Sequence, residues 1–298
     1  MMPWGELAAL ATAVCWSFTA ILFSYGGRRV GSDVVNRSRL LFALVFLLIT
    51  HRLLEGVFFP RDVEPFRWGW LALSSLLGLV IGDAFLFRAY VLIGPRLSML
   101  MMSTVPILSA VFGRMLFGES VTPVELLGIL MAVGGIAWVV TEGPGQALPD
   151  DRRVYRRGLL FAFLGALGQV TNLVTARFAL GDGFSTISAT LIRILVALLV
   201  LWGLAAARGQ VGHTFHQWRD RRALGAIVAG STVGPFLGIW LSLIAIQNAR
   251  LGIASTLMAL PPVLLIPLEY ALYRRRVSRR ALAGTLAAMA GVAVLLWQ

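Results

Sequence analysis

The chain contains one long segment twice. The residues from Gly78 to Val140 align without a gap on the segment that begins at Gly234, at a constant offset of 156 residues. The matched residues include Gly82 on Gly238, Pro106 on Pro262, Gly128 on Gly284 and Gly135 on Gly291. Glycine and proline are the residue types that most strongly affect local backbone geometry, so a gapless match at these positions indicates a true internal repeat.

Composition places this repeat in a membrane. Of 298 residues, 58% are hydrophobic and only 13% are charged, and the mean hydropathy is +0.82. Soluble domains carry about 25% charged residues. Apolar runs of about 20 residues recur along the whole chain, each long enough to cross a hydrocarbon core of ~30 Å as a helix. The sequence therefore predicts an integral membrane protein without a separate soluble domain.

The apolar runs predict ten membrane helices, at residues 5–25, 35–54, 68–92, 98–117, 123–141, 158–180, 185–207, 224–247, 253–273 and 279–297. The charged segment 142–157 is rich in glycine and proline, which is typical of a linker. It would join a first repeat, residues 1–141, to a second, residues 158–298. The first two helices of each repeat match more weakly, at an offset of 154 that places Arg39 on Arg193.

Each predicted repeat has five helices, and this odd number has a topological consequence. The second repeat must enter the membrane from the side opposite to the first, so the two are inverted. Many secondary transporters use inverted repeats to build two alternating gates around a site at the membrane midplane. The predicted fold class is an all-α integral membrane protein of ten transmembrane helices in two inverted five-helix repeats.

The basic residues indicate an orientation. All of them are arginines, and most lie in the loops after the first, third, fifth, seventh and ninth predicted helices. The positive-inside rule places those loops in the cytoplasm and both chain termini outside. The net charge of +12 is therefore interpreted as a topology signal rather than as a nucleic-acid-binding surface.

The sequence lacks the usual signatures of catalysis and metal binding. Its single cysteine, Cys15, rules out an internal disulfide and a cysteine-rich metal site. His213 and His216 fall in a predicted interfacial loop without a nearby thiol or carboxylate that would complete a metal site. No glycine-rich phosphate loop with its lysine is present. We therefore expect no enzymatic activity, no metal and no cofactor.

The segment FGESVTPVELLGILMAVGGI (117–136) resembles the end of an EamA repeat from the drug/metabolite transporter superfamily. The residues that carry the resemblance are Pro106, Gly118, Glu119, Pro123, Gly128 and Gly135. The second predicted helix is similar too, through Arg39, so the resemblance covers essentially the whole chain as two repeats. In the second repeat, arginines at 274–276 replace the Gly-Glu turn. The resemblance implies cytoplasmic termini, opposite to the charge count.

The resemblance implies a multi-pass transporter in a bacterial inner membrane that exports amino acids or related small metabolites by alternating access. The expected partners are a small-molecule substrate and the lipid bilayer; the oligomeric state stays open. One alternative is an organic-phosphate or nucleotide-sugar exchanger, which would need several arginines converging on a cavity. Another is a non-transporting membrane scaffold, whose centre would be dry and fully packed.

Asp83 is the most informative polar residue. It lies near the middle of the third predicted helix, where a charge costs about 2.5–3.5 kcal/mol on insertion scales. Two interpretations remain open: a proton carrier or substrate-amine partner, or an ion pair with Arg88 or Arg39. Proton-coupled antiport would need such a carboxylate, whereas facilitated diffusion would not. The repeat places Ile239 opposite Asp83.

Other polar and aromatic residues are candidates for a substrate site. Arg193 lies deep in its helix, where it would bind a substrate carboxylate or an acidic partner, whereas Arg39 lies near a helix end, where arginine side chains reach water. Gln169 and Asn172 share a helix face, as a hydrogen-bonding wall for a solute or as contacts between helices. The further candidates are Trp16 and Ser17, in the matching region of the first helix, and Trp240, which would line a cavity or pack.

Prolines mark the predicted gates. Pro106 and the pair Pro261 and Pro262 interrupt the backbone hydrogen bonds near the first third of the fourth and ninth predicted helices. We expect the third, fourth, eighth and ninth helices to form the cavity wall and the first and sixth to move as gates. Glu269 is predicted to pair with the arginines at 274–276, and the alternative is that it carries a proton.

Overall fold

The computed structural model describes residues 4–142, 152–265 and 279–297, which form helices joined by short connections, without a strand. The helices of the first half are α1 (Trp4–Val30), α2 (Ser32–Glu55), α3 (Pro65–Ser75), η1 (Leu76–Gly82), α4 (Asp83–Met102), α5 (Val105–Phe117) and α6 (Pro123–Glu142). Those of the second half are α7 (Arg152–Ala179), η2 (Gly181–Gly183), α8 (Thr186–Ala207), α9 (Val211–Gln217), α10 (Arg221–Ser231), η3 (Thr232–Gly238), α11 (Ile239–Asn248), α12 (Leu251–Met258) and α14 (Arg279–Leu296).

Several of these helices are long and apolar enough to cross a membrane. Within the described residues there are seven: Trp4–Val30, Ser32–Glu55, Pro65–Leu86, Pro123–Thr141, Arg152–Ala179, Thr186–Ala207 and Arg221–Asn248. Three shorter apolar helices cover Val105–Phe117, Leu251–Leu265 and Leu282–Leu296. The prediction of an all-helical, multi-pass membrane chain is therefore confirmed.

Some predicted boundaries were wrong. The connection predicted at 93–97 is helical, because α4 continues to Met102 and the chain breaks instead at Ser103 and Thr104. Ala89 and Ile93 of α4 pack against Ala162 of α7, and such tertiary packing overrides the local helix-breaking preference of the Gly-Pro pair.

Two polar segments predicted as linker or loop are also partly helical. Residues 152–157 form the start of α7, while 143–151 lie outside the described residues. The segment with His213 and His216 forms the short helix α9. Phe215 of α9 contacts Trp202 and Trp218 through its ring, and these aromatic contacts hold the segment against the bundle.

The two halves repeat at the level of backbone geometry. The π-helical segments η1 and η3 occupy equivalent positions, since 76–82 and 232–238 differ by the offset of 156. Pro235 lies inside η3 and cannot donate a backbone hydrogen bond. Each segment also has a glycine that lets another helix approach closely: Gly78 packs against Asn172 and Gly234 against Thr19.

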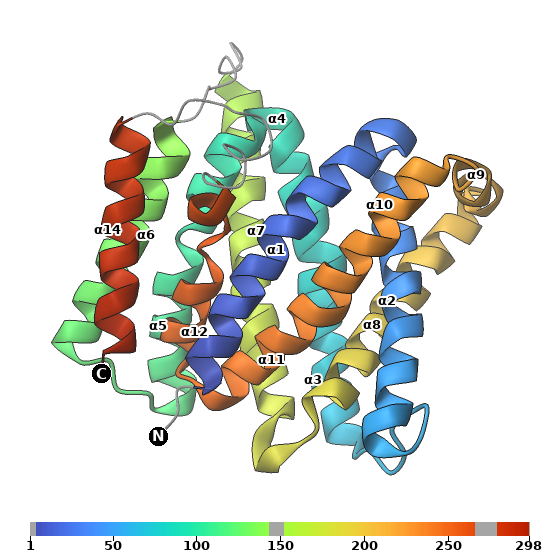
Figure 1. The fold of residues 1–298 in the computed structure, drawn as a ribbon, viewed down its shortest axis with the longest axis horizontal. Helices are drawn as coiled ribbons and strands as arrows, with labels where there is room; N and C mark the ends of the chain where they lie inside the picture. The colour runs from blue at the N-terminus through green and yellow to red at the C-terminus, as the bar shows by residue number, and fades with distance from the viewer. Residues whose placement is uncertain (1–3, 143–151, 266–278, 298) are drawn as a thin grey trace.

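Equivalent helices run in opposite directions. In Figure 1, α1 runs away from the end where both termini lie, whereas α7 runs toward it; α6 and α14 lie side by side and antiparallel. The contacts are also exchanged, because α1 packs on α10, η3 and α11, while α7 packs on α3, η1 and α4. A Cβ atom on Gly135 of α6 would collide with the backbone of Gly284 and Ala288 in α14, as the glycine spacing predicts for a close-packed seam.

Candidate functional site

A buried polar cluster surrounds Arg193, about 10 Å along α8 from its first residue. The Arg193 side chain is buried, with a residue exposure of 2%. Its Nη2 donates to Oδ1 of Asn172 in α7 at a distance of 2.5 Å. Ser74 of α3 donates to the same Oδ1 at 2.8 Å, and Gln169 lies 3.5 Å from the Asn172 amide nitrogen. We call these four residues the Arg193 cluster.

Local sequence explains how the cluster assembles. Asn172 packs on Gly78 of η1, where any Cβ atom would collide with the amide group. Ser75 donates to the backbone oxygen of Arg193 at 2.6 Å, which ties α3 to α8. The pair Ser74 and Ser75 was not identified from the sequence as part of the site. Its signal was two adjacent hydroxyls inside an otherwise apolar helix.

The charge of Arg193 is not neutralised by a carboxylate within the described parts of the chain. Its Nε is buried without a hydrogen-bond partner there. A buried charge without a counter-ion is energetically expensive, so such groups are usually paired. A guanidinium in this state can bind a carboxylate or phosphate through two hydrogen bonds.

Arg39 has a different environment. Its Nη2 lies 2.9 Å from Oδ2 of Asp83, the first residue of α4, and the exposed fractions of the two side chains are 9% and 26%. Of the two partners considered for Asp83, the structure brings Arg39 into contact and leaves Arg88 exposed on the surface of α4. The cluster residues Gln169, Asn172 and Arg193 thus lie together, while Asp83 and Arg39 form a separate pair.

The aromatic candidates pack against residues of both arginine-bearing helices. Trp16 and Trp240 pack against one apolar cluster that includes Leu40 of α2 and Leu191 of α8. Trp240 Nε1 also donates to the hydroxyl of Thr186, at 3.0 Å. Ser17 is buried and donates to Ala13 of its own helix at 2.8 Å.

The candidate prolines lie directly after helix interruptions. Pro106 follows the break at Ser103 and Thr104 and lies in the first turn of α5. Pro261 and Pro262 follow the equivalent break at 259–260, after which helical backbone resumes. The prolines therefore begin helical segments instead of kinking continuous helices, consistent with the preference of proline for a first turn. Glu269 and the arginines at 274–276 lie outside the described residues.

Two ion pairs that join the halves were also missed from the sequence. Arg177 Nη2 lies 2.7 Å from Oε1 of Glu119, and Arg250 pairs with Glu125. Glu119 also accepts from the backbone nitrogen of Leu251, at 2.9 Å. These residues belong to the turn between α5 and α6, the start of α6, the last turn of α7 and the start of α12, and Figure 1 shows the α5–α6 turn at the end of the bundle that holds both termini. The sequence signal for these ion pairs was the presence of opposite charges near predicted helix ends on the same side of the membrane. We call them the inter-repeat ion pairs.

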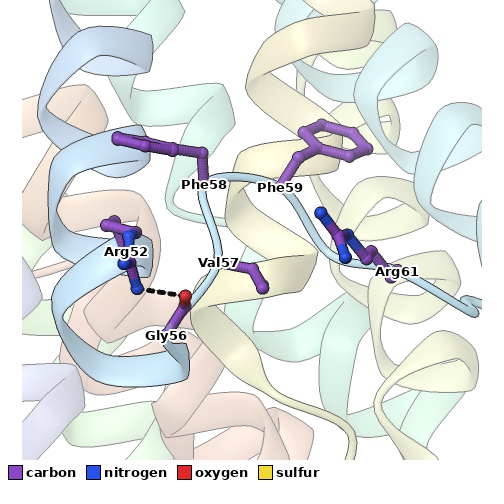
Figure 2. Close-up of a pocket in the computed structure, with 6 residues that line it drawn as sticks. All are labelled: Arg52, Gly56, Val57, Phe58, Phe59 and Arg61. Carbon is purple, nitrogen blue, oxygen red and sulfur yellow. Dashed lines mark hydrogen bonds between the residues drawn. The ribbon is translucent and has the colours of Figure 1, made fainter.

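A pocket of about 470 Å³ lies where α2 ends, which Figure 1 shows at the same end of the molecule as the termini. Figure 2 shows its wall, which consists of Arg52 at the end of α2 and residues of the following turn: Gly56, Val57, Phe58, Phe59 and Arg61. Arg52 donates to the carbonyl oxygen of Gly56. No residue of this wall belongs to the Arg193 cluster, so the pocket is a separate feature.

Comparisons with known proteins support a transporter fold. One solved structure, described only as "Crystal structure of protein", superposes with a TM-score of 0.76 at 20% sequence identity, over 97% of this chain and 95% of that chain. At this identity the likeness shows the fold alone. A comparison with curated proteins yields no match. The profile of the EamA-like transporter family matches twice, at residues 3–141 and 156–297. The chain therefore belongs to the EamA-like transporter family.

Proposed function

We propose that this chain is a secondary transporter of a bacterial inner membrane that exports amino acids or related small metabolites by alternating access. The proposal includes ten membrane helices in two inverted five-helix repeats. It is supported by the antiparallel course of α1 and α7 and by the three shorter apolar helices, which bring the seven long spans to ten. The end of α4 would complete the short span of α5.

Arg193 is the single observation that carries the substrate class. Its buried guanidinium donates to the neutral amide of Asn172, and its Nε has neither a hydrogen-bond partner nor a carboxylate among the described residues. A substrate carboxylate would neutralise this charge and bind the free Nε edge. Such a contact gains strength where water is excluded, because the effective dielectric constant is low there.

The alternative substrate, an organic phosphate or nucleotide sugar, would need several unneutralised arginines at one place. Arg39 is already paired with Asp83. Of these two arginines, only Arg193 is without a carboxylate partner in the described part of the chain. This difference favours a monocarboxylate over a phosphate carrying two charges.

The inter-repeat ion pairs support alternating access. They tie the turn between α5 and α6 to α7 and α12 at the terminal end of the bundle. In the aligned sequence of the second repeat, the residue that corresponds to Glu119 is Arg275. We propose that these ion pairs close one gate and break when the transporter opens toward that side.

The test is a counterflow assay with purified protein in liposomes. The panel pairs each amino acid with the amine that lacks its carboxyl group, so that the two solutes differ by one functional group. We expect exchange of amino acids and at least about tenfold slower exchange of the amines, because a lost charge-assisted hydrogen bond is worth about 1.5–3 kcal/mol. Equal rates for both solutes would refute the role of the carboxylate, and no exchange of either would refute the substrate class.

A further inference from the structure

The pocket at the end of α2 is built from charged and aromatic side chains. Gly56 ends the helix with a φ of 76°, a left-handed conformation that favours glycine. The chain therefore turns sharply after Arg52 and brings Phe58 back toward it, so that the guanidinium carbon lies 5.9 Å from the ring centroid. Figure 2 shows Arg52 and Arg61 on either side of Val57.

The two arginines have no counter-ion in the wall. Arg52 donates to a backbone carbonyl, and Arg61 forms no ion pair or hydrogen bond with any residue that the structure describes. No carboxylate lines the pocket. Of the nearest acidic residues, Glu55 accepts a hydrogen bond from Ser185 at 2.7 Å, and Asp62 is exposed outside the wall. The pocket therefore has the charge that an anion requires.

An apolar face of α2 leads directly to this pocket. Val45, Ile49 and Leu53 are spaced four residues apart and are 46%, 50% and 78% exposed. In a membrane-spanning helix, such a face contacts acyl chains. Phe58, in the pocket wall, is 60% exposed. The pocket thus lies where an apolar, lipid-facing surface meets two cationic side chains, which is the arrangement of a lipid tail and its headgroup.

We propose that the pocket formed by Arg52, Gly56–Phe59 and Arg61 binds the phosphate of an anionic membrane lipid. The two guanidinium groups contact the phosphate oxygens, and an acyl chain follows the face formed by Val45, Ile49 and Leu53. A free phosphate ion offers the same charge without the chain, so the two sources differ in their need for the apolar face.

The test measures the thermal unfolding midpoint of the purified protein in a neutral detergent. One arm adds phosphatidylglycerol, a second adds phosphatidylcholine and a third adds inorganic phosphate. Arg61→Gln is the main variant, because its side chain is exposed and its replacement does not disturb packing. Arg114→Gln is the matched control, since Arg114 is an exposed arginine in the last turn of α5 that does not line the pocket.

We expect phosphatidylglycerol to raise the midpoint of the wild type and of Arg114→Gln. In Arg61→Gln, the lipid concentration needed for half of that rise should increase about fivefold, because one arginine near an anionic headgroup increases the lipid affinity by about that factor. The proposal is overturned if the wild type does not respond or if the two variants respond alike. An equal rise with phosphatidylcholine overturns the anionic selectivity, and an equal rise with inorganic phosphate overturns the lipid as the source.

Discussion

Arg39 and Arg193 occupy equivalent positions in the two halves but have different partners. Arg39 is paired with Asp83 at 2.9 Å. Arg193 is more deeply buried and contacts the amide oxygen of Asn172 instead of a carboxylate. The difference follows from one residue of the repeat, because the counterpart of Asp83 is Ile239, which is buried and apolar. The scaffold is shared, whereas the neutralising charge is present in one half.

This comparison indicates a division of labour. A salt bridge with one partly exposed member can hold α2 to α4 at modest energetic cost. A buried guanidinium without a carboxylate is costly, and natural proteins retain such groups mainly at functional sites. We therefore interpret Arg39 as a scaffold residue and Arg193 as a binding residue, and each of the following variants tests one side of that contrast.

The largest effect is expected for Arg193→Gln. Counterflow of amino acids should fall by up to about 100-fold, because the charge-assisted contact with the substrate carboxylate is lost. The free energy of unfolding, measured by detergent denaturation, should stay unchanged or rise, because an uncompensated buried charge is removed. Arg114→Gln is the control. If Arg193→Gln lowers the free energy of unfolding but leaves counterflow unchanged, the assignment of Arg193 as a binding residue is contradicted.

Asp83→Asn should act mainly on stability. It leaves Arg39 without its counter-ion, and breaking a buried pair costs about 3–5 kcal/mol. Because Asp83 is 26% exposed, we expect a smaller loss of about 2 kcal/mol in the free energy of unfolding. The double variant Asp83→Asn with Arg39→Gln should recover part of it.

The same Asp83→Asn variant separates coupling from structure. If Asp83 also carries the transported proton, counterflow should persist while uptake driven by a pH gradient is lost. Proton-driven transport that stays intact in proteoliposomes would exclude Asp83 as the coupling residue and leave it only the ion pair with Arg39.

Ile239→Asp would make the two halves alike. It introduces a carboxylate at the position equivalent to Asp83, where it can neutralise Arg193 and compete with the substrate. We expect an amino-acid affinity about tenfold lower, corresponding to about 1.4 kcal/mol. Ile239→Asn, which adds polarity without charge at the same buried site, is the control. Equal affinities of the two variants would show that position 239 does not reach Arg193.

Glu119→Gln tests the asymmetry between the two ends. Arg177 would lose its carboxylate, although its Nη1 would keep its hydrogen bond to the backbone of Ala249. We expect the free energy of unfolding to fall by about 1 kcal/mol, and exchange to become faster because one gate opens more easily. Slower exchange with unchanged stability would contradict a gating role for the inter-repeat ion pairs.

The smallest effect concerns an exposed pair. Asp220 accepts from the backbone nitrogen of Ala223 and lies 2.7 Å from Arg29, and these contacts lower the pKa of its carboxyl group, with the backbone hydrogen bond as the largest cause. The stability it adds is present above its unfolded pKa and is lost as the pH falls through the folded value. In Asp220→Asn, the free energy of unfolding measured at acidic pH should fall slightly less steeply with decreasing pH than in the wild type. Added salt should reduce this difference between the two proteins.

Much of the fold could be predicted from the sequence, and the reasons are local. The repeat is visible because Gly78, Gly234, Pro106 and Pro262 occupy positions that the backbone constrains. Those same positions fall in or beside the π segments and helix interruptions of the structure. The membrane class follows from hydropathy, which needs no knowledge of contacts. The boundary after Leu92 failed because packing of α4 on α7 overrode a local helix-breaking signal.

The candidate site could be predicted only in part. Its residue types were identified because a charge or amide inside an apolar helix is rare. Their partners were not, because a contact between helices depends on the rotation and register of each helix, which no local pattern specifies. Tertiary packing alone determines that Asp83 pairs with Arg39 and not with Arg88, and that Ser74 contacts Asn172. Tertiary packing also leaves Arg193 without a carboxylate in the described chain, because partners on different helices meet only in the assembled bundle.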